Sequence, residues 1–173
     1  MDIKIKGIDE LIVKLNPKVA KQAVNRTINE LGSKTRTFLV KEVRLNYNIS
    51  AKDLKQFIKI KKSSYADLSY VMDIRSSSFN AKRFNAKKLK AKGKMSVLIK
   101  KTDGRKVFKK GTFVAKNGAV LQRKGNTQEI EGVKTVSIPQ MFNEKTLQKA
   151  DKLIENEHER IFKNNFNFYI GKE

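Results

Sequence analysis

The sequence predicts an α+β fold in which a long N-terminal helix and a long C-terminal helix pack on an antiparallel β-sheet. Apolar residues recur at helical spacing over residues 17–45 and 147–162, which predicts the two helices. Between them, residues 95–125 alternate apolar and polar side chains and carry turn residues, which predicts a β-meander. At 173 residues we expect a single domain over 1–173.

The first residues predict a short edge strand, because Ile3, Ile5 and Ile8 alternate with polar side chains. A short helical piece is expected to begin at Asp9. The opening residues contain no apolar run, so we expect no N-terminal secretion signal.

The long helix is predicted from Pro17 to about Leu45. Proline is tolerated in a first helical turn, and Asn16 before it is a suitable N-cap. Gly32 and Ser33 lie midway, where a weak helix former predicts a bend. The residues expected on the buried face are Ala20, Val24, Ile28, Leu31, Phe38 and Leu45.

A second, short helix is expected after Ser50, with Asp53 at its third position as in a capping box. Ile58 and Ile60 alternate with lysines, and Tyr70, Met72 and Ile74 alternate with Val71, Asp73 and Arg75, which predicts two strands.

Residues 79–94 form a basic arm, which we predict to be a loop or a weakly helical segment. Its large apolar residues are Phe79, Phe84 and Leu89. A lysine-rich run of this kind is often an ordinary solvated surface, and this alternative stays open.

The meander after the basic arm is predicted from its turns. Asp103-Gly104 and Asn117-Gly118 are strong hairpin signals, and apolar residues on either side of them predict short antiparallel strands. The apolar face of the meander is thin, so we expect it to pack against the helices.

The C-terminal helix is expected to be capped by Asn143. Glu155, Glu157 and Glu159 give this helix an acidic face, and residues 166–170 form an apolar tail that needs cover. The residues expected in its buried stripe are Leu147, Ala150, Leu153, Ile154, Ile161 and Phe162.

The net charge of +22, from 39 basic and 17 acidic residues, is the strongest compositional signal. Such an excess repels itself in a compact monomer, so it predicts an anionic partner or a place in an assembly. A merely lysine-rich soluble protein is the alternative. The absence of cysteine excludes disulfides and thiolate metal sites. No apolar run is long enough for us to expect a membrane span.

The sequence offers little catalytic chemistry. His158 is the single histidine, and its core spacing on the C-terminal helix indicates a structural role. Glu155 and Glu159 share a helix face, but a metal site built on them would lack a second histidine. The glycines of the meander fit turns better than a phosphate-binding loop. We therefore predict no catalytic, cofactor-binding or metal-binding residues and no enzyme.

Nucleic-acid binding through the basic arm and hairpin is the alternative function. Phe79, Phe84, Phe108 and Phe113 stand among lysines and arginines, as base-stacking side chains in a positive groove would. No sequence motif of a known nucleic-acid-binding fold accompanies them, and charge alone is a non-specific signal.

An ordered set of segments runs through nearly the whole chain. Its members are Ala23-Val24-Asn25-Arg26-Thr27, Val43 to Ile49, Lys52-Asp53-Leu54, Ile58-Lys59-Ile60, Gly111-Thr112-Phe113-Val114-Ala115, Gly118, Arg123 with Gly125, and Val136 to Phe142. Together they resemble the prophage minor tail protein Z family, the tail-completion proteins of lambda-like long-tailed phages. The resemblance implies a virion structural protein near the head-proximal end of the tail, related in plan to ring-forming tail terminator and head-tail connector proteins.

The resemblance and the residue patterns agree on a non-enzymatic assembly protein. We expect a phage or prophage minor tail protein, made in the host cytoplasm, that acts in tail completion and head-tail joining. The expected partners are other tail or connector proteins and further copies of the chain, in an oligomer such as a ring. Non-specific contact with DNA is a further expectation, and we expect no membrane and no cofactor.

Two sets of side chains are candidates for these contacts. The candidates for contact with DNA or an acidic partner are Lys82, Arg83, Lys87, Lys88, Lys90, Lys92, Lys94, Arg105, Lys106, Lys109 and Lys110. The candidates for a subunit interface are Met141, Phe142, Phe166, Phe168, Tyr169 and Ile170.

Overall fold

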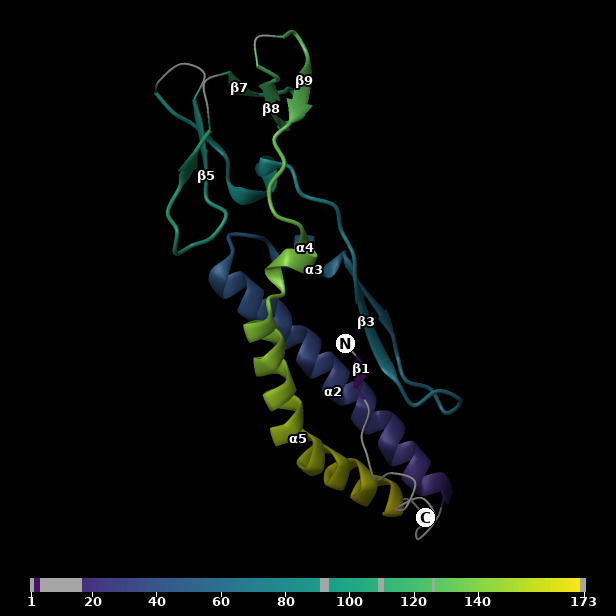
Figure 1. Ribbon diagram of the computed structural model, residues 1–173. Coiled ribbons are helices and arrows are strands. Elements are labelled where there is room, and N and C mark those ends of the chain that lie inside the picture. Colours follow the sequence, from purple (N-terminus) through teal and green to yellow (C-terminus); the bar gives the residue numbers. More distant parts are fainter. Residues whose placement is uncertain (1, 4–16, 91–93, 109–110, 126, 172–173) are drawn as a thin grey trace. The chain divides into compact units, whose positions relative to one another are not determined.

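The computed structural model describes residues 2–3, 17–90, 94–108, 111–125 and 127–171, and its fold is α+β as predicted (Figure 1). The predicted N-cap at Asn16 and the helical piece after Asp9 lie outside the described residues. We expected one domain, and internal contacts divide the chain into two compact units. Unit 1 consists of Met1–Leu39, Ile58–Ile74 and Glu144–Glu173, and unit 2 of Val40–Phe57 and Arg75–Asn143.

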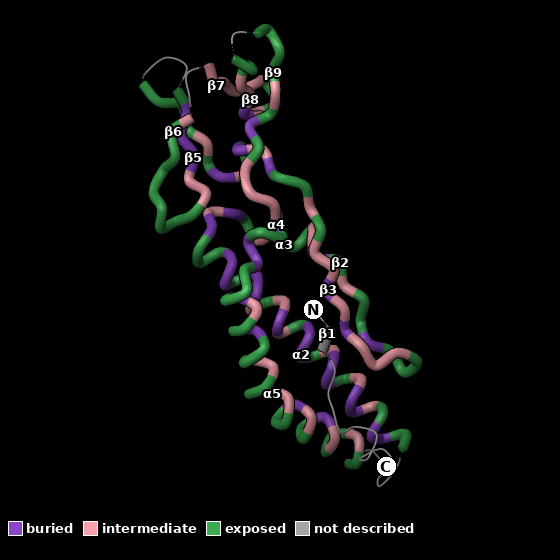
Figure 2. Tube along the Cα trace, in the orientation of Figure 1, coloured by how far each residue is buried: buried purple, intermediate pink, exposed green. Residues whose placement is uncertain are grey.

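The long N-terminal helix is confirmed as α2 (Pro17–Asn46), which is continuous through Gly32. Leu31 is buried as predicted, but Phe38 is half-buried and Leu45 is 57% exposed. A step of seven residues falls about 20° short of two full turns, so stepping by sevens from Leu31 leaves the buried stripe. The other buried residues of the helix are Val19, Ala20, Ala23, Val24, Thr27, Ile28, Gly32, Thr35, Leu39, Val40, Glu42 and Val43 (Figure 2).

A three-stranded antiparallel sheet belongs to unit 1. Its strands β1 (Asp2–Ile3), β3 (Tyr70–Ile74) and β2 (Ile58–Lys61) lie in that order, so β1 is an edge strand as predicted. The loop after β2 is tied to α2 because Asn29 Nδ2 donates to the Ser63 carbonyl at 3.0 Å and Asn29 Oδ1 accepts from the Ser63 amide at 3.0 Å.

The C-terminal helix is α5 (Glu144–Ile170), which packs along α2 within unit 1. Ala150 and Ile161 are buried as predicted, and Thr146 and Asn165 join them. The other residues of the predicted stripe, Leu147, Leu153, Ile154 and Phe162, are half-buried.

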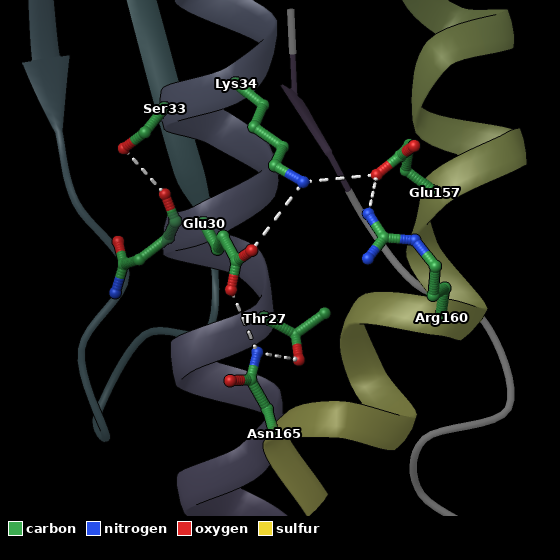
Figure 3. A network of polar contacts seen from close by, with 8 residues as sticks. Thr27, Glu30, Ser33, Lys34, Glu157, Arg160 and Asn165 are labelled. Carbon is green, nitrogen blue, oxygen red and sulfur yellow. Dashed lines mark hydrogen bonds and ion pairs between the residues drawn. The ribbon is translucent and has the colours of Figure 1, made fainter.

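Polar contacts fix the register between α2 and α5 (Figure 3). Asn165 Nδ2 donates to the buried Thr27 hydroxyl at 3.1 Å. About two turns further along α2, Lys34 Nζ donates to Glu157 Oε2 at 3.1 Å. Arg160 pairs with the same carboxylate. Because a buried polar group loses its hydrogen bond when the helices slide, these contacts select one alignment.

Unit 2 is built from short elements. Ser50 Oγ accepts from the Asp53 amide at 3.0 Å, which confirms the predicted cap of α3 (Ala51–Lys55). The other helical pieces are η1 (Ala81–Phe84) and α4 (Ile138–Met141). The strands are β4 (Lys87–Lys88), β5 (Met95–Val97), β6 (Lys106–Val107), β7 (Thr112–Val114), β8 (Val120–Arg123) and β9 (Ile130–Gly132).

The strands of unit 2 form two three-stranded antiparallel sheets, ordered β4-β5-β6 and β7-β8-β9. The predicted meander is therefore divided between β6 and β7. The turn before β8 places Gly118 at a φ of 79°, a left-handed conformation that glycine adopts without steric cost. The hairpin signal at Asn117-Gly118 thus marks a real turn.

The start of the basic arm is anchored to β8 through one side chain. Asn80 Oδ1 accepts from the Val120 amide at 2.9 Å, and Asn80 Nδ2 donates to the Val120 carbonyl at 2.8 Å. The same oxygen accepts from the Lys82 amide and caps η1. Phe79 and Phe84 are buried on either side of Asn80, so this part of the arm is a packed element of unit 2.

Candidate interaction surfaces

Three of the candidate cationic residues are held within unit 2. Lys82 Nζ donates to the carbonyl of Asn117. Arg83 pairs with the carboxylate of Asp53, and its guanidinium lies 4.7 Å from the ring centroid of Phe79. These contacts orient η1 and α3, so Lys82 and Arg83 already have partners inside the fold.

Arg105 is the third, and it fixes the sheet β4-β5-β6. Its Nε donates to Ser96 Oγ at 3.0 Å, and its Nη2 donates to the Asn85 carbonyl at 2.6 Å and the Ser96 carbonyl at 3.1 Å. Arginine has a planar fork of donors that suits such multiple bonding. Arg105 therefore ties the segment before β4 to the central strand β5.

Five further candidates lie on or beside this sheet and are exposed. They form what we call the lysine surface: Lys87 and Lys88 on β4, Lys90, Lys94, and Lys106 on β6. Within the part of the chain that the structure describes, none of the five has a carboxylate partner. Lys92, Lys109 and Lys110 lie outside the described residues.

The positive charge is concentrated in unit 2. Unit 2 contains 22 lysines and arginines against 5 aspartates and glutamates, whereas unit 1 contains 17 against 12. Besides Arg83 with Asp53, the ion pairs of unit 2 include Lys100 with Asp103 at 3.9 Å and Lys124 with Glu129 at 3.3 Å. Five carboxylates cannot neutralise 22 cations, so unit 2 carries a large uncompensated charge.

The four phenylalanines that the sequence suggested as base-stacking residues differ in how far they are buried. Phe84 is 0% exposed and Phe79 is 5% exposed, and their rings pack against each other with centroids 6.4 Å apart. Phe108 and Phe113 are half-buried. Phe79 and Phe84 are therefore core residues of unit 2, with no face free for a base.

The candidate subunit-interface residues are also divided by burial. Met141 and Phe142 are buried within unit 2, so they offer no surface to a neighbour. Phe166 and Tyr169 are half-buried in unit 1, and Phe168 and Ile170 are exposed.

The apolar tail of α5 is partly covered by its own unit. The ring of Phe166 stacks on Phe162 with centroids 5.7 Å apart, and Arg26 of α2 lies 4.3 Å from the ring centroid of Phe168. Ile170 is 50% exposed. The exposed apolar surface at this helix end is thus smaller than the sequence suggested.

An acidic row runs along the exposed side of α5. Asp151, Glu155 and Glu159 are exposed and follow each other at four-residue spacing, which places them on one helix face. Glu157, which the sequence grouped with this face, instead contacts Lys34 and Arg160. The four-residue spacing is the signal that identifies Asp151 as a member of the row.

His158 and the glutamates of α5 were the residues considered for catalysis or metal binding. His158 is half-buried, and its Nδ1 lies 2.8 Å from the Glu155 carbonyl oxygen. Within the residues that the structure describes, no three histidine, aspartate or glutamate side chains cluster as metal ligands would. No helix in the described parts is both long and apolar enough to cross a membrane.

Comparison of the chain with protein-family models, with curated proteins and with solved structures finds no match.

Proposed function

We propose that this chain is a minor tail protein of a phage or prophage that acts in tail completion and head-tail joining. It works through protein-protein contacts rather than by catalysis, and its site of action is the virion tail. The observation that carries the proposal is the ordered set of segments from Ala23 to Phe142 that resembles the prophage minor tail protein Z family.

The structural roles of these segments support the proposal. Val136 to Phe142 contains Ser137 and Gln140, which form the capping box of α4. Gly118 and Gly125 both have positive φ angles, of 79° and 55°, where other residues are strained. The segments that carry the resemblance thus include residues that determine local structure. Proteins of one family share such residues because they share a fold.

The surfaces of the molecule suit association. The helix α5 presents the acidic row and the exposed side chains of Phe168 and Ile170. Charged and apolar patches of this kind set the orientation and strength of protein contacts. The proposed partners are other tail or head-tail connector proteins and further copies of this chain.

Deletion of the gene in a phage that carries it tests the proposal. The expected lysate contains filled heads and separate tails in electron micrographs, and supplying the chain in trans restores joined, infectious particles. Joined and infectious particles from the deletion phage contradict the proposal. A tagged chain recovered with purified tails provides an independent measurement.

A further inference from the structure

We propose that the lysine surface of unit 2 binds duplex nucleic acid through its phosphates, without preference for sequence. The inference stands on the charge and geometry of unit 2 and does not depend on the proposed tail function. The nearest competitor is an acidic protein surface, such as the acidic row of α5 on a second copy.

The sheet β4-β5-β6 holds the lysine backbones in a defined arrangement. Lys87 pairs with Ser96 and Lys88 with Met95 across β4 and β5, and Lys106 pairs with Val97 across β5 and β6. Met95, Ser96 and Val97 are buried, so the lysines flank a packed central strand. Cations on a preformed sheet lose less conformational freedom on binding than cations on an unstructured chain.

The lysines have no competing anion close by in the described structure. Arg105 occupies the polar groups of Ser96 and Asn85, while the ammonium groups of the lysine surface are left to solvent. Phosphates of a duplex form a dense line of negative charge, and lysines that neutralise them release condensed counterions. This release favours binding without any base contact.

The composition of the surface favours a polyanion over a protein partner. Protein interfaces are depleted in lysine and draw their affinity from buried aromatic and arginine residues. Here the surface is lysine-rich, Phe84 before β4 is buried in unit 2, and Phe108, two residues after Lys106, is half-buried. Arg83 is likewise held by Asp53.

The burial of the phenylalanines also favours a duplex over a single-stranded nucleic acid. Proteins that bind single strands without sequence preference stack bases on exposed aromatic rings. Of the four candidate stacking residues, Phe79 and Phe84 have no exposed ring face to offer, and Phe108 and Phe113 are half-buried. Phosphate contact without stacking is sufficient for a duplex, whose bases are already stacked on each other.

Fluorescence anisotropy of the full chain with two labelled duplex DNAs of about 30 base pairs and unrelated sequence tests the proposal. We expect equal affinities for the two sequences. With about six phosphates engaged, the affinity is expected to fall on the order of a thousandfold between roughly 50 and 200 mM salt. The affinity for a duplex RNA of the same length shows whether the surface distinguishes RNA from DNA as the source of the phosphates.

A matched pair of variants locates the binding surface. Replacing the five residues of the lysine surface by glutamine is expected to reduce the slope of log affinity against log salt by roughly one for each lysine that contacts a phosphate. The control replaces five exposed lysines of unit 1 by glutamine and removes the same charge. Its substitutions are Lys21→Gln, Lys59→Gln, Lys145→Gln, Lys152→Gln and Lys163→Gln.

The proposal is overturned if the chain fails to bind duplex DNA at low salt, or if the two variants lose affinity equally. It is also overturned if poly-glutamate displaces duplex DNA at equal charge concentration and the lysine-surface variant loses self-association instead. A third variant, with arginine at the same five positions, keeps the charge and is expected to keep the salt slope. Circular dichroism melts of each variant confirm that the fold is retained.

Discussion

The ring of Tyr70 on β3 lies directly over Gly32 on α2. A methyl group at position 32 would come within 2.4 Å of Tyr70 Cγ and within 2.5 Å of both Cδ atoms. Tyr70 is 1% exposed, so the ring has no room to move aside. The glycine is therefore required by the close approach of the sheet to the helix in unit 1, a role that the predicted bend did not suggest.

Gly32→Ala is expected to lower the stability of the protein by about 1–3 kcal/mol, because it overpacks this contact. A loss of stability would identify the contact with Tyr70 as its cause, because alanine in a helix interior is otherwise more stabilising than glycine by roughly 0.5–1 kcal/mol. Thermal melts followed by circular dichroism measure the change. In a Tyr70→Ala background, which removes the ring, the same substitution should no longer destabilise.

Asn80→Ala is expected to cost about 1–3 kcal/mol, because it leaves the amide of Val120, a residue buried in unit 2, without its partner. The Val120 carbonyl loses the Asn80 donor but still accepts from the Val133 amide at 2.9 Å. Asn80→Asp keeps the oxygen that accepts from Val120 and Lys82 but loses the donor, so it should fall between wild type and Asn80→Ala. Urea titration measures the series, and equal stabilities for all three proteins would contradict the bonding described.

Aspartate substitutions along α2 report the position of its buried stripe. Leu31→Asp is expected to unfold the protein, because a buried unpaired charge costs several kcal/mol against a total stability of about 5–15 kcal/mol. Phe38→Asp should cost less, since Phe38 is half-buried. Leu45→Asp should be nearly neutral. A melting temperature that Leu31→Asp leaves unchanged would place the stripe elsewhere.

The elements that the sequence predicted well are those with local signals. The period of apolar residues identified α2, and the cap at Ser50 identified α3. Side chains that alternate with a period of two residues identified β2 and β3. Each signal depends on residues within a few positions of one another, which is why it can be read without tertiary contacts.

The features that the sequence did not reveal depend on distant residues. Asn80 binds Val120 forty positions away, and nothing near Asn80 marks it as a partner for a strand. The burial of Phe79 and Phe84 likewise follows from tertiary packing. In the candidate surface, composition identified the lysines, but the hydrogen bond from Arg105 to Ser96 depends on the pairing of β5 with β6, which composition does not show.

Acidification is expected to weaken the pairing of α5 with α2 within unit 1. Hydrogen bonds from Arg160, which has the larger effect, and from Lys34 hold the pKa of Glu157 below its ordinary value of 4.5. A lowered folded-state pKa stabilises the fold above the unfolded value, and this contribution is lost as the pH falls through the folded pKa. Lys34 also contacts Glu30 at 3.7 Å, so protonation of Glu157 leaves that pair in place.

Glu157→Gln measures this contribution. The melting temperature of the variant should be lower than that of wild type near neutral pH, and the difference should shrink as the pH falls below the ordinary glutamate pKa of 4.5 and through the lowered pKa of Glu157. Glu155→Gln, on the exposed acidic row of the same helix, provides the control and should show a smaller difference. An undiminished difference between Glu157→Gln and wild type at low pH would show that the ion pairs are not its source.

Copies of the chain are expected to associate with one another, and the salt dependence of this association identifies the surface responsible. Light scattering of the full chain, alone and with tail-tube or connector proteins, is expected to give a mass above that of a monomer. A monomer under all these conditions contradicts the expectation. Two kinds of contact are available, the exposed apolar end of α5 at Phe168 and Ile170, and attraction between the acidic row and the lysine surface of another copy.

The two kinds of contact respond oppositely to salt. At a net charge of +22, copies repel one another, and salt screens this repulsion within about 10 Å at 0.1 M. An oligomer held by the apolar end should therefore strengthen with salt, and the pair Phe168→Ser with Ile170→Ser should dissociate it. An oligomer held by the acidic row should weaken with salt, and Asp151→Asn with Glu155→Gln and Glu159→Gln should dissociate it. We expect the first result, because the acidic row holds three carboxylates and cannot offset the repulsion between two copies of unit 2.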